Sequence, residues 1–463
     1  MPLLIGRIFD FVVPFNLITV NIDIHNKLTF SIYLKKHPLK NESVDIKSKY
    51  LSALVSFSTE YGLSEYSNAL LQLYRTELLG NDFTDNLVSS KINSVIAYRF
   101  KDFRLKSHNS CFCFDCLFIL ALNNRVLGNS VLYRLKKKIH FWHYSKADSL
   151  FSLLYDRVGK VDCLPEHLYA FWNANVGFQK EFYLKNLVLA TMSAGKSTLI
   201  NALAGKKICK SQLMACTDRI HYIYNKPIED FYIAKLDGNL SLNVTDDKLL
   251  TDSADGVTDA SVVSTFFNWS QDARSCFIDS PGVNSSMNKH HEGITKEFVK
   301  KGELFDQIIC VIDATTIGTN DSNTFLNFIY EKANHKRVIF VLNKLDLYRC
   351  EDDSIEEAIN SLRDDLKRCK FVNPLICPVF AMPALLLKKK IFGYELTKYE
   401  HRAIEDYRYV LNDPFYDLSK YYKEFTIEKA LSFREGEVIK DKECVDLLYR
   451  TGLPYLEYLI INR

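Results

Sequence analysis

Short, purely apolar runs that end at polar residues recur through the second half of the chain. Residues 187–189, 277–278 and 338–342 contain only Leu, Val, Ile and Phe. Unbroken runs of this kind are typical of parallel strands that are buried on both faces. The first run is followed by residues 197–204, whose apolar positions fit a helix, and then by Gly205, a residue type common at helix C-termini. The pattern predicts an α/β domain, in which strands alternate with helices.

The first 180 residues follow a different pattern. Residues 16–34 alternate apolar and polar positions on either side of a polar turn at 25–27, which predicts a β-hairpin. Residues 44–60 and 65–80 have apolar positions three and four apart, which predicts two helices. We therefore expect an N-terminal α+β domain over residues 1–180, for which the sequence indicates no role.

The last 70 or so residues have helical spacing. Residues 394–412, 420–433 and 440–450 predict helices, so we expect a helical segment over residues 393–463 that closes the α/β region of residues 181–392.

The α/β region also contains two further runs that favour strands. Residues 231–234 and 262–267 are rich in β-branched and aromatic residues and flank a polar loop at 250–260. We expect them to add strands to the sheet.

A phosphate-binding loop follows the first apolar run, at residues 190–198 (ATMSAGKST). It lies between a predicted strand and a predicted helix N-terminus, where backbone N–H groups and the helix dipole favour an anion. Gly195 lets the backbone approach a phosphate, Lys196 can reach the outer phosphates, and Ser197 can offer a hydroxyl to Mg²⁺. Ala190 stands where the usual pattern has glycine. We expect nucleotide contacts from Ser193, Ala194, Gly195, Lys196, Ser197 and Thr198.

Two further motifs indicate which nucleotide binds. Asp279 and Gly282 follow the second apolar run, a spacing that places a carboxylate near the metal and a glycine N–H near a γ-phosphate. Asn343, Lys344 and Asp346 follow the third run. Asp346 can accept hydrogen bonds from the N1–H and 2-amino groups that guanine has and adenine lacks, while Lys344 can lie along the base. Open α/β sheets bind ligands at such strand ends, so the motifs predict a guanine-nucleotide-binding domain.

These motifs resemble those of the bacterial dynamin-like GTPases. The resemblance covers residues 181–390 and rests on five segments, residues 190–203, 215–218, 279–282, 311–321 and 343–346. It implies a Ras-like P-loop GTPase domain over residues 181–392, with a mixed sheet and helices on both faces. It also implies GTP hydrolysis with Mg²⁺ as cofactor, and a nucleotide-dependent dimer.

The resemblance also assigns roles to individual residues. It implies that Thr217 is the switch threonine that binds the metal and positions the attacking water, and that Ser193 lies next to the transferred phosphate. With Lys196, these are the expected catalytic residues. The expected Mg²⁺ ligands are Ser197 and Thr217, with Asp279 acting through water. Met192 stands where eukaryotic dynamins carry glutamine, so that part of their water-positioning apparatus has no counterpart here.

Two observations bear on base contact and turnover. Ala381 follows a predicted strand at the place where GTPases present a backbone N–H to the guanine oxygen, although Phe380 replaces the usual serine. No glutamine follows Gly282 and no arginine finger can be assigned, so we expect slow intrinsic turnover.

Composition indicates a compact chain. Of 463 residues, 47% are hydrophobic and 25% charged, with only 17 glycines and 11 prolines, which argues for two or three domains without long flexible linkers. The net charge is +3, with the basic excess in residues 1–180.

No run is long enough to span a bilayer, since residues 111–122 are too few and include Asp115. The apolar N-terminus is interrupted by Arg7 and Asp10 and lacks a signal-peptide cleavage site.

The 12 cysteines are scattered, as expected for reduced thiols in a cytosol. We expect a cytoplasmic protein, with peripheral contact at the inner membrane surface left open.

Two N-terminal features have alternative interpretations. His108, Cys111, Cys113 and Cys116 are four candidate zinc ligands, but Cys-x-Cys is not a favoured zinc spacing, and alternation with phenylalanines also fits a half-buried strand. We favour buried thiols. Residues 133–143 mix cations with aromatics, which suits an anionic membrane or nucleic acid, but a solvated face is the simpler interpretation. We expect no nucleic-acid partner.

The end of the sequence leads to a further expectation. Residues 452–457 (GLPYLE) resemble the family segment that closes the GTPase region, and a long helical stalk follows it in the family. Because this sequence stops at Arg463, we expect no filaments and no membrane tubes. Two alternatives stay open, a GTP-gated protein-binding switch with slow hydrolysis and a ribosome- or RNA-associated GTPase.

Overall fold

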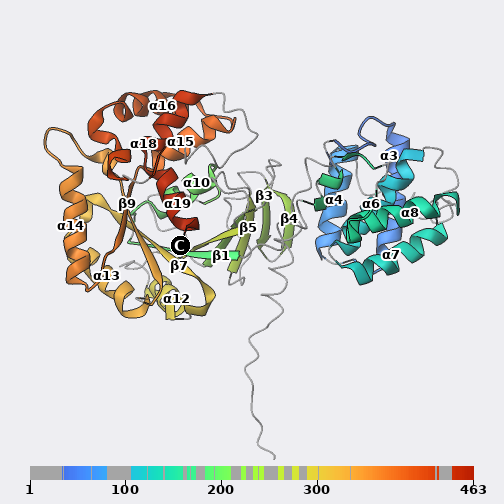
Figure 1. Cartoon of the computed structure of the whole chain (residues 1–463), viewed down its shortest axis with the longest axis horizontal. Coiled ribbons are helices and arrows are strands. Elements are labelled where there is room, and N and C mark those ends of the chain that lie inside the picture. Colours follow the sequence, from blue (N-terminus) through green and yellow to red (C-terminus); the bar gives the residue numbers. More distant parts are fainter. Residues whose placement is uncertain are drawn as a thin grey trace, which may run out of the picture. The chain divides into compact units, whose positions relative to one another are not determined.

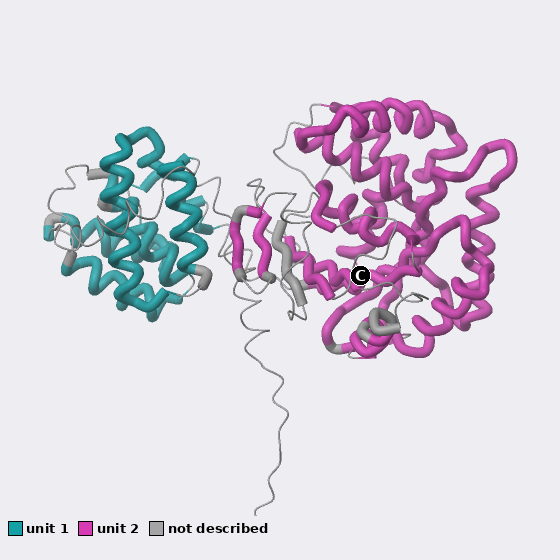
Figure 2. The backbone as a smooth tube through the Cα atoms, turned by 180° about the vertical axis from the view of Figure 1, so that it is seen from behind, with its two compact units in different colours: residues 1–179 teal, residues 180–463 magenta. Residues whose placement is uncertain are grey.

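The computed structural model describes most of the chain (Figure 1). The described residues are 34, 36–63, 65–80, 106–122, 124–138, 141–159, 164–166, 168–170, 172–173, 183–191, 193–209, 220–225, 233–237, 239–244, 259–264, 274–280, 289–300, 302–333, 335–422, 425–426 and 441–462. The chain divides into two compact units, residues 1–179 and 180–463 (Figure 2). Each unit is described by itself.

The larger unit contains a nine-stranded sheet in the order β4-β3-β5-β2-β6-β1-β7-β8-β9. The strands are β1 Tyr183–Ala190, β2 Ile220–Asn225, β3 Ile233–Asp237, β4 Asn239–Val244, β5 Asp259–Ser264, β6 Arg274–Asp279, β7 Gln307–Asp313, β8 Arg337–Asn343 and β9 Leu375–Val379. The run from β6 to β9 is parallel, whereas β2 is antiparallel to β6 and β3 is antiparallel to β4 and β5. The predicted mixed sheet is confirmed.

The apolar runs account for the centre of this sheet. All seven residues of β7 are buried, as are the last five of β8, which is why these strands carry no alternation. The three runs that predicted strands form β1, β6 and β8. The two further runs are confirmed where the structure describes them, since residues 233–234 lie in β3 and residues 262–264 lie in β5, whereas residues 231–232 and 265–267 lie outside the described residues.

Helices cover both faces of the sheet (Figure 1). They are α10 Lys196–Ala204, α12 Lys289–Lys300, α13 Asn320–Ala333, α14 Ile355–Arg368, α15 Ala381–Ile391, α16 Lys398–Leu411, α18 Lys442–Arg450 and α19 Leu453–Ile461. Figure 1 shows α10, α15 and α19 on one side of the strands and α12 and α13 on the other. Short 3-10 turns connect these elements at Gly302–Leu304, Ala314–Thr316, Leu345–Leu347, Pro414–Tyr416 and Leu418–Tyr421.

The C-terminal helices are fastened to the sheet domain by buried polar contacts. Lys388 of α15 donates to Glu457 of α19, and both side chains are almost fully buried. Phe380 N donates to Thr451 O at 2.9 Å. Gly452 lies where a Cβ would overlap Pro378 O, at φ 76°, which explains why glycine occupies this helix start. The GLPYLE segment is therefore part of the domain core.

Two of the predicted C-terminal helices are confirmed, as α16 and α18, but the prediction over residues 420–433 is wrong where the structure describes it. A 3-10 turn ends at Tyr421, and Tyr422, Phe425 and Thr426 are not helical. The local reason is that Asp417 caps the short turn through Ser419 N, after which the buried Tyr422 donates its hydroxyl to Pro378 O. Residues 427–433 lie outside the described residues.

The described part of the N-terminal unit is helical. Its elements are α3 Val44–Thr59, α4 Glu65–Leu79, α6 Lys106–Ala121, α7 Arg125–Lys138, a 3-10 turn Phe141–His143, α8 Tyr144–Phe151 and a π-helical turn Ser152–Asp156. The helices predicted over residues 44–60 and 65–80 are confirmed as α3 and α4. The hairpin predicted for residues 16–34 lies outside the described residues except at Leu34.

The strand interpretation of the cysteine cluster is wrong, because these residues form α6. Residues 110–119 are all buried, so this part of the helix has no exposed polar face. Without such a face the apolar positions show no 3.6-residue period. Phe114 and Phe118, one turn apart, stack at 5.7 Å between ring centroids. The phenylalanine alternation that suggested a strand is thus incidental to a helix buried all round.

Candidate nucleotide-binding site

The parallel strands bring the sequence motifs to one edge of the sheet. Val188 pairs with Asp279, and Asp313 pairs with Asn343, which pairs in turn with Val379. The carboxyl ends of β1, β6, β7, β8 and β9 therefore lie side by side. The motifs lie far apart in the sequence and are assembled by this register alone.

Two residues of the phosphate-binding loop have positive φ. Gly195 has φ 90°, and a Cβ at this position would overlap the side-chain nitrogen of Asn343. Ser193 also has positive φ, at 63°, and is exposed. α10 begins directly after the loop at Lys196, with Ser197 and Thr198 half-buried in its first turn. The loop thus curls tightly in front of a helix N-terminus, the arrangement that binds anions.

Lys196 and Asp279 form an ion pair at the centre of this edge. Lys196 Nζ donates to Asp279 Oδ1, and both side chains are buried. A buried carboxylate without a partner would be costly, so each charge stabilises the other. The pair places a cation and a carboxylate beside the phosphate-binding loop.

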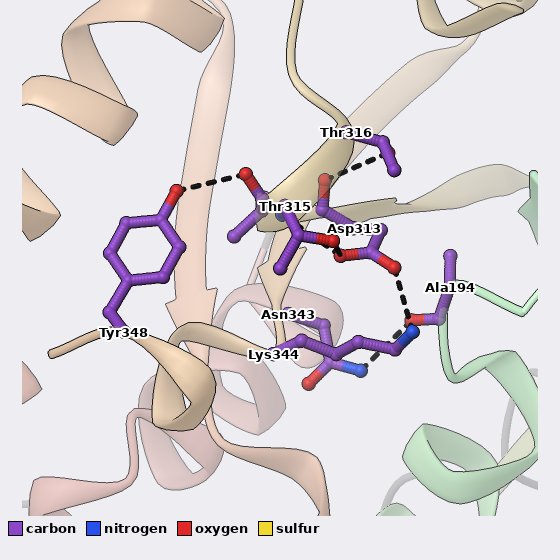
Figure 3. A network of polar contacts seen from close by, with 8 residues as sticks. Ala194, Asp313, Thr315, Thr316, Asn343, Lys344 and Tyr348 are labelled. Carbon is purple, nitrogen blue, oxygen red and sulfur yellow. Dashed lines mark hydrogen bonds and ion pairs between the residues drawn. The ribbon is translucent and has the colours of Figure 1, made fainter. Parts of the chain in front are cut away.

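Asn343 joins three segments of the site. Its Nδ2 donates to Ala194 O at 3.0 Å, and its Oδ1 accepts from Ala381 N at 3.2 Å. Figure 3 shows Asn343 facing Ala194 of the phosphate-binding loop. Since Asn343 is buried, both bonds are protected from water. The Ala381 N–H, which we expected to face the base, donates to Asn343.

Lys344 has positive φ, 66°, and its Nζ donates to Asp313 Oδ2 at 2.7 Å (Figure 3). Asp313 ends β7 and is buried, while Lys344 is half-exposed. The ammonium is thereby directed across the strand ends.

Asp346 lies in the 3-10 turn that follows. Burial raises the pKa of its carboxyl above the ordinary value, and the charge of Asp313 adds to this, whereas its own backbone N–H and Lys344 lower the pKa. Among the described residues, the carboxylate of Asp346 takes part in none of the hydrogen bonds and ion pairs that join the strand ends. A half-buried acceptor at this place is suited to donors of a ligand.

Oxygen donors suited to Mg²⁺ are present at the same edge. Asp279 is buried at the end of β6, and Ser197 lies in the first turn of α10. Hard oxygen ligands of this kind fit Mg²⁺. Thr217 and Gly282, the other residues predicted to approach the metal and the γ-phosphate, lie outside the described residues, as does Met192.

The structure adds site residues that sequence reasoning missed. Asp313 was noted only as part of the family resemblance, although its position at the end of an apolar run is the signal that identified Asp279. Asn201 accepts from Ile208 N and Cys209 N, each at 2.8 Å, and so ties α10 to the segment that leads to Thr217. No local pattern marks this asparagine, because its partners are backbone groups.

The N-terminal unit contains a separate buried polar cluster on α6. His37 Nε2 lies 3.1 Å from Asp115 Oδ2 and 3.4 Å from Cys111 Sγ, a grouping that could hold a metal ion. However, Leu39 N donates to His37 Nδ1 at 3.2 Å, which puts the ring proton of the neutral imidazole on Nε2. Asp115 also accepts from two tyrosine hydroxyls, those of Tyr50 and Tyr74. Hydrogen bonds account for the cluster, and the thiols of Cys111, Cys113 and Cys116 are buried.

Comparison with known proteins supports the motif assignment. Residues 187–345 match the model of the dynamin family. Over 203 residues the chain is 25% identical to the "Probable transmembrane GTPase FZO-like, chloroplastic" of Arabidopsis thaliana, a match that covers 44% of this chain and 19% of that relative. The chain thus spans about a fifth of the relative it matches. Residues 187–345 are thus similar to the dynamin family, and this match together with the motifs at the strand ends indicates a GTP hydrolase.

Two solved structures show a weak likeness to this chain. Era in complex with MgGDPNP and nucleotides of 16S ribosomal RNA is 19% identical, with a TM-score of 0.28, covering 46% of this chain and 56% of that one. Toc33 from Arabidopsis thaliana in complex with Mg²⁺ and GMPPNP is 12% identical, with a TM-score of 0.28, covering 45% and 75%. At such scores these likenesses carry no functional conclusion. None of the described helices is long and apolar enough to cross a membrane.

Proposed function

We propose that this chain binds GTP with Mg²⁺ at the carboxyl edge of its sheet and hydrolyses it to GDP and phosphate. One observation carries the proposal. The register of β1, β6 and β8 brings a phosphate-binding loop, a buried lysine–aspartate pair and an Asn-Lys-x-Asp segment to the same edge, where Asn343 joins the last to the first at 3.0 Å. Phosphate-binding and base-reading groups are thus held at a fixed separation.

The phosphate end of the site would act mainly by charge and position. The loop amides around Gly195 and the Lys196 ammonium would bind the outer phosphates, so Lys196 would share its charge between Asp279 and the nucleotide. When bound, Mg²⁺ would offset the charge on the β- and γ-phosphate oxygens. Ser197 would contact it directly, and Asp279 through water.

The chemical step is attack of water on the γ-phosphorus. The new P–O bond forms in line with the bridging oxygen of the β-phosphate, which leaves with GDP as the product. We propose that Thr217 positions this water and closes on the metal, and that Ser193 lies beside the transferred phosphate. Because no glutamine follows Gly282 in the sequence and no arginine finger can be assigned, we expect slow turnover by the chain alone.

The base end would select guanine. Asp346 would accept from N1–H and the 2-amino group, and the stem of Lys344 would lie along the ring. We retain Ala381 as the neighbour of the guanine oxygen. In this role the Ala381 N–H would either turn away from Asn343 or donate to Asn343 and the guanine oxygen together.

Phosphate release from purified protein tests the activity. We expect GTP but not ATP to be hydrolysed, with dependence on Mg²⁺. Equal release from ATP, or no release that exceeds a Lys196→Ala sample, would reject the proposal.

Two finer parts of the proposal have separate grounds. We infer a nucleotide-dependent dimer from the family resemblance and a cytoplasmic location from the scattered cysteines, with peripheral contact at the inner membrane surface left open. Sedimentation with a GTP analogue tests the dimer, and sedimentation with anionic vesicles tests the membrane contact.

A first prediction concerns the switch residue. Thr217→Ala should leave GDP affinity near that of wild type and lower the turnover of GTP by at least about tenfold, because its role requires the γ-phosphate. Fluorescent-GDP titration and phosphate release on the same sample measure the two effects. A parallel loss of GDP affinity would remove Thr217 from the switch role.

A second prediction concerns pH. Guanine binding needs the ionised Asp346, and burial raises the pKa of this carboxyl. GDP affinity should therefore be constant above this pKa and fall as the pH decreases through it, beginning at a higher pH than for an ordinary aspartate. Titration with fluorescent GDP across pH measures the effect, and Asp346→Asn should flatten the profile. If GDP affinity still falls at low pH in Asp346→Asn, the pH dependence belongs to another group.

A further inference from the structure

Asp313 has a carboxylate whose two oxygens have different partners. Oδ1 accepts from Thr315 N at 2.9 Å and from Thr315 Oγ1 at 2.7 Å. Oδ2 accepts from Lys344 Nζ at 2.7 Å. The two bonds from Thr315 fix the carboxylate plane, and the buried position of Asp313 at the end of β7 keeps water away. The second oxygen is therefore held toward Lys344.

The segment that holds Thr315 is itself braced. Thr316 Oγ1 donates to Asp313 O at 3.2 Å, and Tyr348 donates its hydroxyl to Ala314 O at 2.8 Å. Figure 3 shows these contacts on one side of Asp313 and Lys344 on the other. Because Tyr348 follows the Asn-Lys-x-Asp segment, the ends of β7 and β8 are bonded twice, once through Lys344 and once through Tyr348.

Lys344 is a side chain that gains from such an anchor. It is only half-buried, and a lysine stem loses considerable rotamer freedom when it is held in one conformation. A fixed point at Nζ keeps the four-carbon stem extended before any ligand arrives. Preorganisation of this kind reduces the entropy lost on binding.

We propose that Asp313 is a positioning residue of the guanine site, which anchors the Lys344 ammonium so that the lysine stem forms one wall for the base. The inference rests on the proposed function, because it assigns the base to the surface between Lys344 and Asp346. Asp313 acts through Lys344 and does not touch the nucleotide.

The substitution Asp313→Asn isolates this role. The amide keeps an oxygen for the two Thr315 donors, so the local turn is retained. The NH₂ group then faces Lys344 and cannot accept from the ammonium. We expect the affinity for fluorescent GDP to fall by about tenfold, or about 1.4 kcal/mol, with the KM for GTP raised by a similar factor and kcat unchanged.

A double-mutant cycle distinguishes a positioning role of Asp313, which acts through Lys344, from a purely structural role. Lys344→Met keeps an apolar stem and removes the ammonium, so Asp313→Asn should cost little further affinity in that background. The matched control is Asp365→Asn. Asp365 is another buried aspartate, and it accepts from Gly318 N at 3.1 Å, so this change disturbs the same loop without touching Lys344. It should leave GDP affinity within about twofold of wild type.

The outcomes separate the two proposals. Wild-type protein that fails to bind fluorescent GDP would reject the proposed function and the inference together. Wild-type binding, with Asp313→Asn unchanged or with its loss fully additive to that of Lys344→Met, would overturn the inference alone. An equal loss in Asp365→Asn would assign the effect to loop order and would overturn it as well. Thermal unfolding of each variant without nucleotide verifies that it is folded.

Discussion

Lys196→Ala is expected to abolish nucleotide binding, with affinity for both GDP and GTP reduced by at least about a hundredfold, or about 2.7 kcal/mol. The ammonium belongs to the phosphate-binding loop itself, and it is buried beside Asp279. Its removal takes one positive charge away from the phosphates. It also leaves a buried carboxylate unpaired, which adds repulsion toward an incoming anion.

Fluorescent-nucleotide titration measures this loss. The matched control is Lys207→Ala, which removes another lysine near the end of α10 whose partner is Glu400 at 3.2 Å. This control should bind GDP as wild type does. In Lys196→Ala, Asp279 has lost its partner, and this unpaired charge can also affect folding. The titration should therefore be repeated on the double variant Lys196→Ala with Asp279→Asn, which lacks the unpaired charge. Recovery of wild-type GDP affinity in that double variant would contradict the phosphate role of Lys196.

Asp346→Asn is expected to exchange guanine for xanthine. The amide presents a donor to the 2-position, where xanthine has an oxygen, and it no longer offers two acceptors to N1–H and the 2-amino group. GTP affinity should fall by about 3 kcal/mol or more, as expected for the loss of charge-assisted hydrogen bonds, while XTP affinity should rise.

Competition of GTP and XTP against a fluorescent nucleotide measures both changes. Asp352→Asn serves as the control, because this exposed aspartate follows in the same connection and is not placed at the strand ends. It should leave the preference for guanine unchanged. An Asp346→Asn protein that binds GTP as tightly as wild type would show that the base lies elsewhere.

The central strands and the phosphate-binding loop could be predicted from sequence because their signals are local. The apolar run at residues 338–342 is short and rich in β-branched residues, which favours a buried strand. Gly195 is needed where a Cβ would overlap Asn343. The order of the strands could not be predicted. β2 lies between β5 and β6, parallel to β5 and antiparallel to β6, a choice that depends on partners 39 or more residues away.

The errors have the same origin. The sequence of α6 also fits a half-buried strand because a helix buried on all sides lacks the periodicity that identifies helices. The turn at Leu418–Tyr421 replaces a predicted helix because Tyr422 bonds to Pro378, a contact with β9. The sequence assigns no role to Asp313, because the role depends on its contact with Lys344. The two residues are brought together only by the pairing of β7 with β8.

We propose that the carboxyl edge of the sheet forms a guanine-nucleotide site. Displacement of fluorescent GDP from the wild-type chain, with GDP, GTP, ATP and XTP as competitors in Mg²⁺ buffer, tests it most directly. We predict that GDP and GTP displace the probe at similar low concentrations and that ATP and XTP fail at concentrations at least a hundredfold higher. Displacement by ATP as readily as by GTP would contradict the account.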